Sequence, residues 1–112
     1  MKYLILKLPY HAYNVPFNNA AALLKEANGV EGWRITPTRL HDVEHAILLF
    51  RGQILEEYHI NEVITYNKDE RRCKFDMKPV KNSGFKGKMM SDYKTPNSAS
   101  ILEFDKLEML VQ

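Results

Sequence analysis

Cysteine is nearly absent from this chain of 112 residues, in which Cys73 is the only one. A single cysteine excludes an internal disulfide framework and any cysteine-rich zinc module. Long apolar runs are also absent: none exceeds five residues, the length of Ala46 to Phe50, which is far too short to cross a bilayer. The apolar N-terminus is interrupted by Lys7 and offers no small-residue cleavage site, so we expect no signal peptide. These absences favour a reduced, cytoplasmic protein that has no membrane partner.

The composition that remains is typical of one globular domain. Hydrophobic residues make up 45% and charged residues 27% of the chain, a balance that allows a core to form and argues against a disordered tail. The length of 112 residues matches one domain, and no repeat, low-complexity stretch or long linker divides it. We therefore expect residues 1–112 to fold as a single domain.

Charge is unevenly distributed along the chain, although the formal net charge is only +2. Residues 71–96 hold eight basic and two acidic side chains, a net of +6, whereas residues 41–70 hold two basic and seven acidic ones, a net of −5. A local excess of positive charge can attract phosphates even in a nearly neutral molecule, because salt screens charges beyond a Debye length of about 8 Å. The alternative is a solvated face whose lysines serve solubility.

Apolar patterns predict mainly β-strands. The almost continuous apolar run at 3–8 suits a strand buried on both faces, and 46–50 suits a central strand. Residues 53–66, after a turn at Arg51-Gly52, exceed the usual strand length, so we expect a bulge or bend near Asn61.

Further strands and the helices follow from alternation and capping. Residues 71–78 alternate, which predicts a strand whose inward side chains are Cys73, Phe75 and Met77. The remaining expected elements are a helix over 20–27, a short strand at 33–35, a helix from Pro37 to about His45, a short helix within 85–93, a strand at 101–104 and a return strand through 107–111. Together they predict an α+β fold: a curved mixed sheet or open barrel of five to six strands with two or three short helices.

Two short motifs resemble catalytic or binding signatures. His41-Asp42-Val43-Glu44-His45 has the H-x-x-E-H letters of an inverted zinc-protease motif, and on a helix its two histidines could share a metal. Such a site needs a third ligand and a cleft, so we expect a polar helix face, with no metal and no cofactor. Gly84-Phe85-Lys86-Gly87 has the G-x-x-G letters of the KH module but follows a strand, so we interpret it as a glycine turn whose amides and lysines could contact phosphate.

Cys73 and the aromatic residues each have two interpretations. Basic neighbours could lower the pKa of the Cys73 thiol, but its alternation with Phe75 places it in the core as a small apolar residue. Trp33, Tyr10 and Tyr13 are candidates for stacking on unpaired bases. Trp33 shares its alternation with Ile35, which favours the core for its ring.

Residues 30–104 resemble small PUA-like modules, the pseudouridine-synthase and archaeosine-transglycosylase-like folds that include the ASCH and EVE branches. The resemblance is carried by Gly32-Trp33-Arg34-Ile35, Gly52-Gln53-Ile54, Arg71-Arg72 ahead of Phe75, and Gly87-Lys88. It departs at Asp76, where a glycine is expected, and at Met89, near an expected serine. The resemblance implies a compact mixed barrel whose open end accepts a nucleobase, often a modified one, with basic residues on the backbone.

The leading functional hypothesis is a non-catalytic module that binds RNA or DNA. Its predicted phosphate contacts are Arg71, Arg72, Lys74, Lys86 and Lys88, with Arg34 and Arg39 at the rim. One alternative is a small inhibitor or adaptor that binds an acidic protein surface. Another is a nucleoside or RNA hydrolase of the ASCH type, for which Lys88 and Glu57 are residues of the required types.

Overall fold

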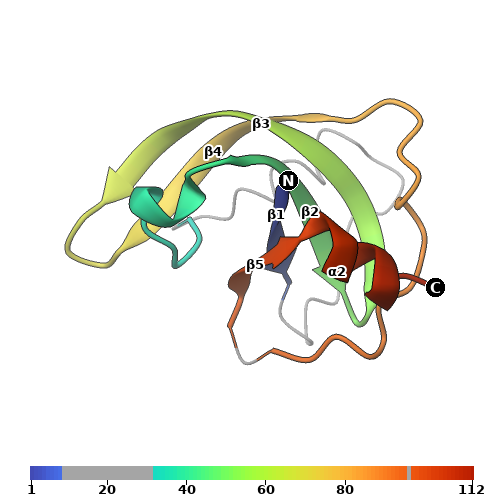
Figure 1. Ribbon diagram of the computed structural model, residues 1–112. Helices are drawn as coiled ribbons and strands as arrows, with labels where there is room; N and C mark the ends of the chain where they lie inside the picture. Colours follow the sequence, from blue (N-terminus) through green and yellow to red (C-terminus); the bar gives the residue numbers. More distant parts are fainter. Residues whose placement is uncertain (9–31, 96) are drawn as a thin grey trace.

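A computed structural model describes residues 1–8, 32–95 and 97–112. They form five strands, one 3-10 turn and one α-helix: β1 (Lys2–Lys7), η1 (Pro37–Leu40), β2 (Val43–Phe50), β3 (Gln53–Asn67), β4 (Arg72–Pro79), β5 (Ala99–Glu103) and α2 (Phe104–Leu110). The strand order is β4-β3-β2-β1-β5, in which β1 and β2 run parallel and every other neighbouring pair is antiparallel. The sheet is curved, and β3 arches over the molecule beside β4 (Figure 1). The predicted α+β fold with a curved mixed sheet is confirmed.

The inner strand β1, between β2 and β5, is buried on both faces because its side chains point alternately to two apolar clusters. Leu4 and Leu6 join the first cluster, which also contains Trp33, Tyr58 and Phe75. Tyr3 and Ile5 join the second, which α2 covers through the fully buried Leu107. The two clusters account for the continuous apolar run at 3–8, since a strand covered on both sides needs no polar face.

The long strand β3 contains the expected irregularity. Its register with β4 skips a residue between Ile60 and Glu62, which leaves Asn61 as the bulged position, and a second shift falls between Val63 and Thr65. Each bulge changes which face the following side chains occupy. Ile64 is skipped at the second shift and is 56% exposed, although it has the same sequence parity as the buried Ile54.

The turn between β2 and β3 and the alternation in β4 are also as predicted. Arg51 and Gly52 both have positive φ, 49° and 80°, the combination that favours a tight hairpin. Cys73, Phe75 and Met77 are all buried, and the residues between them are more exposed.

Two expected helices are wrong. Residues 37–45 do not form one helix: the 3-10 turn ends at Leu40, Asp42 has a φ of 64°, and Val43 already belongs to β2. Pairing of this segment with β1 outweighs its local helical pattern. Within 85–93 there are turns instead of a helix, because backbone groups there bond to the start of β3, as Gly87 N–H does to the Ile54 carbonyl.

Of the two strands predicted near the C-terminus, one is present and the other is wrong. The strand predicted at 101–104 is present as β5, but the expected return through 107–111 is the helix α2 with Leu107 on its buried side. The segment predicted as a strand at 33–35 makes a single bridge, from Trp33 to Cys73. The helix predicted over 20–27 lies outside the described residues. Within the described parts of the chain, no helix has the length and apolar character that a membrane crossing requires.

Candidate nucleic-acid interface

The β3–β4 hairpin turn places two arginines at one end of the sheet. The side-chain oxygen of Asn67 accepts hydrogen bonds from the backbone N–H groups of Asp69 and Glu70, at 3.1 and 3.2 Å. Arg71 follows with a φ of 57° and its side chain is exposed. Arg72 then begins β4. The capped turn therefore fixes where both guanidinium groups leave the backbone.

A third arginine comes from the segment that runs beside β4. The backbones of Trp33 and Cys73 exchange two hydrogen bonds, of 2.7 and 2.8 Å. Trp33 and Ile35 are buried at 7% and 2% exposure, so Arg34 between them faces outward. The Nη1 atom of Arg72 donates to the Gly32 carbonyl at 3.2 Å, which joins this segment to the hairpin.

Four arginines border one cavity of about 840 Å³, which we call the arginine hollow. It is lined by Arg34, Ile35, Thr36, Arg39, Asp69, Glu70, Arg71, Arg72, Asn97 and Ala99. Arg39 reaches it from η1, and Ala99 reaches it from the start of β5. A second cavity of about 320 Å³ shares Arg34, Arg72 and Asn97 with it and adds Ser98. The hollow thus joins segments from three separate parts of the chain.

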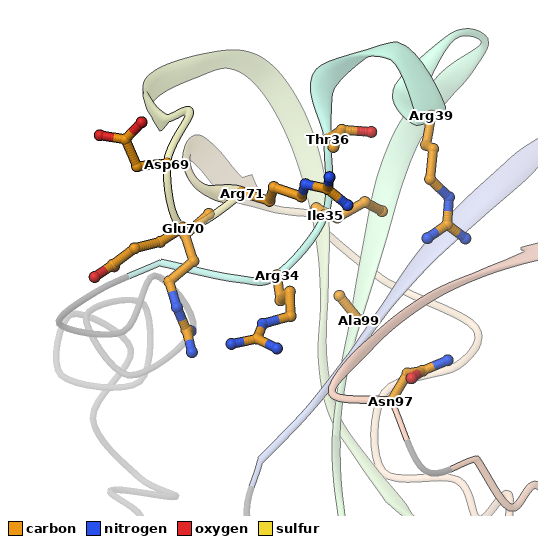
Figure 2. A pocket seen from close by; sticks show the side chains of 10 residues that line it. Arg34, Ile35, Thr36, Arg39, Asp69, Glu70, Arg71, Asn97 and Ala99 are labelled. Carbon is orange, nitrogen blue, oxygen red and sulfur yellow. The ribbon is translucent and has the colours of Figure 1, made fainter.

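The arginine hollow carries an excess of positive charge. Its four guanidinium groups stand against two carboxylates, and in Figure 2 Asp69 and Glu70 point away from Arg34, Arg39 and Arg71. Among the described residues, the ion pairs are His41–Asp42, His45–Glu57 and Lys86–Glu56. No carboxylate of the described residues therefore lies within ion-pair distance of an arginine of the hollow. Guanidinium groups in this state suit phosphate, which they can bind through two parallel hydrogen bonds.

Only part of the predicted phosphate-binding set is brought together. Arg34, Arg39, Arg71 and Arg72 share the hollow, whereas Lys74 lies two residues further along β4 and does not line it. Lys86 and Lys88 lie at the opposite end of β3, where the carbonyl of Lys88 accepts from Ile54 N–H. Most of β3, a strand of 15 residues, lies between the two groups. The structure therefore places Arg71 and Arg72 at one end of β3 and the lysines of the glycine turn at the other.

The candidate stacking residues do not supply an exposed ring in the described structure. Trp33 is a core residue, 7% exposed, because its segment pairs with β4 and its ring packs in the first apolar cluster. Stacking of a base on Trp33 is therefore not expected. Tyr10 and Tyr13 lie outside the described residues.

A buried acidic pair was not identified as a site from the sequence. Glu56 and Glu57 are 4% and 5% exposed on β3. Glu57 accepts from Ser83 Oγ at 2.5 Å and Tyr3 Oη at 3.4 Å, and its Oε2 lies 2.9 Å from His45 Nδ1. The carboxylate of Glu56 pairs with Lys86 Nζ at 2.9 Å. The only signal in the sequence was the interruption of an apolar strand by two acids.

The contacts of this pair indicate a structural role. Ser83 Oγ also accepts from the N–H groups of Phe85 and Lys86, so Glu57 anchors the 83–86 turn to the sheet. Lys86 pairs with Glu56, and the contacts of the Glu57 carboxylate among the described residues are with Ser83, Tyr3 and His45. Burial raises the pKa of Tyr3 to about 12, and the negative charge of Glu57 adds to the rise. Burial likewise raises the pKa of Tyr58, whose hydroxyl finds no hydrogen-bond partner among the described residues.

The H-x-x-E-H letters do not lie on one helix, and Cys73 is a core residue. His41 lies in a turn and His45 in β2, so they are not one helical turn apart. No group of three or more metal-ligating side chains is found in the described parts of the chain. Cys73 is fully buried, its Sγ lies 3.0 Å from the Ile35 carbonyl, and burial raises the pKa of its thiol.

Comparisons of the chain with protein-family models, with curated proteins and with solved structures give no match. The arginine hollow is therefore interpreted from its own geometry and charge.

Proposed function

We propose that this protein binds nucleic acid, with the arginine hollow as the site that holds phosphates. The observation that carries the proposal is the convergence of four guanidinium groups on one cavity in which no described carboxylate pairs with them. Arg72 is already held by the Gly32 carbonyl, so part of the side-chain ordering is complete before a ligand arrives. The resemblance of residues 30–104 to PUA-like modules supports the same proposal.

The proposal assigns the phosphate contacts to the arginine hollow and not to the basic side chains as a whole. The lysines of the glycine turn stand apart from the hollow, and Lys86 is engaged by Glu56. Phosphate contacts should therefore come from Arg34, Arg39, Arg71 and Arg72. Four contacts to a single strand correspond to a slope of log affinity against log salt of about −3.

Salt titration with a fluorescein-labelled 20-nucleotide strand, as RNA and as DNA, tests the proposal. Replacing two exposed arginines, in Arg34→Ala/Arg71→Ala, should weaken binding roughly tenfold or more and reduce the slope by about 1.4. The matched control Lys78→Ala/Lys88→Ala removes the same charge from exposed positions outside the hollow and should change affinity less than threefold or so.

Two results would overturn the proposal. One is equal weakening by the arginine and lysine variants, which would indicate attraction by net charge alone. The other is no binding of either strand at about 50 mM salt, where phosphate contacts are strong. In the latter case a binder of acidic protein surfaces becomes the better interpretation of the same arginines.

A further inference from the structure

The size of the arginine hollow restricts which form of nucleic acid can reach its guanidinium groups, an inference that rests on the proposed function. A cavity of about 840 Å³ is within the size range of pockets that hold one small ligand, about 300–1,000 Å³, whereas the major groove of B-DNA alone is about 12 Å wide. A whole duplex is wider than one of its grooves and cannot enter. A single strand, which exposes its backbone and its base faces, can.

The lining of the hollow is mainly charged and polar. Ile35 and Ala99 lie among the side chains of Arg34, Arg39 and Arg71 (Figure 2), but each is only 2% exposed and offers little apolar surface. A ligand that fills the hollow must therefore present phosphates together with other polar groups. An unpaired strand offers phosphates, sugars and free base edges, whereas in a duplex the bases are paired and their faces are stacked inside.

The hollow and the cavity beside it together offer more space than one phosphate occupies. The adjoining cavity of about 320 Å³ shares Arg34, Arg72 and Asn97, so the two cavities meet along these side chains. The wall at 97–99 is fixed by the sheet, since Lys7 N–H donates to the Ser98 carbonyl at 2.7 Å and Lys7 Nζ donates to the Thr95 carbonyl. A fixed wall of this kind favours a ligand that threads along the cavities over one that requires them to widen.

We infer that the hollow selects single-stranded over double-stranded nucleic acid. The strand lies across the two adjoining cavities, with its phosphates on Arg34, Arg71 and Arg72. A duplex contacts only the outermost groups and binds through general electrostatic attraction. RNA and DNA strands share this chemistry and are separate arms of the test.

The test compares one 20-nucleotide sequence as a single strand, as a blunt duplex, and as a duplex with a short single-stranded overhang. Competition against a labelled strand should show the single strand binding at least tenfold more tightly than the blunt duplex, with the overhang recovering most of the difference. In Arg34→Ala/Arg71→Ala the preference should fall below about threefold, and in Lys78→Ala/Lys88→Ala it should persist.

Failure of this inference is distinguishable from failure of the proposed function. A blunt duplex that competes as well as the strand overturns strand selection while leaving nucleic-acid binding in place. A preference that survives in Arg34→Ala/Arg71→Ala also overturns it, because the hollow would not be its source. Absence of binding by all three forms contradicts the proposed function itself.

Discussion

Replacing Gly32 by alanine is expected to lower the free energy of unfolding by about 3 kcal/mol. Gly32 has a φ of +85°, which costs an L-residue about 1–2 kcal/mol. A Cβ there would lie 2.4 Å from the backbone oxygen of Cys73, so the segment must also move away from β4. That movement weakens the two Trp33–Cys73 hydrogen bonds, each contributing about 1 kcal/mol.

The control for this experiment is Gly84→Ala. Its φ is outside the left-handed region and a Cβ there meets no atom within 4 Å, so urea unfolding should show a change below about 1 kcal/mol in either direction. Gly32→Ala should also weaken binding of the labelled strand, because Arg34 and the carbonyl that holds Arg72 both belong to the displaced segment. Equal stability of the two alanine variants would contradict the described pairing of residues 32–35 with β4.

Glu57→Ala is expected to be destabilising to a similar extent, by about 3 kcal/mol. The substitution removes a buried carboxylate whose partners are Ser83, Tyr3 and His45. These polar groups then lack a hydrogen-bond acceptor in a site that contains little water, which is costly. The substitution also releases the turn at 83–86 from the sheet. Glu57→Gln keeps one oxygen, which can accept from Ser83, and places an amide N–H group where the oxygen facing Tyr3 and His45 was, so it should lose about 1–2 kcal/mol.

Glu62→Ala serves as the control for Glu57, because Glu62 is an exposed acid on the same strand. Its substitution should change the free energy of unfolding by less than about 0.5 kcal/mol. Chemical denaturation of the three variants alongside the parent protein measures the series. Comparable losses for Glu57→Ala and Glu62→Ala would show that the polar cluster does not anchor the turn.

The strands could be predicted from the sequence where their burial follows a simple period. β1 reads as apolar because both of its faces are covered, and Cys73, Phe75 and Met77 alternate because β4 has one buried face. The bulge at Asn61 followed from strand length alone. By contrast, residues 41–45 carry a pattern that suits either a helix or a strand, and only pairing with β1 and β3 decides between them.

The site was predicted less well, because summing charge along the sequence does not show which charged side chains are close together in the folded chain. Residues 71–88 look like one basic stretch, yet β4 carries them from one end of β3 to the other. Lys86 is then engaged by Glu56, a contact between residues 30 positions apart that no local pattern encodes. Arg34 and Arg39, predicted as rim residues, proved to share a cavity with Arg71 and Arg72.

The most direct test of where the ligand binds is NMR mapping of the protein titrated with the 20-nucleotide strand. Amide and guanidinium signals should shift at residues 34–39, 69–72 and 97–99, which border the arginine hollow. Signals of residues 81–88 should stay close to their free positions. The largest shifts at 81–88, with the hollow unaffected, would contradict the account.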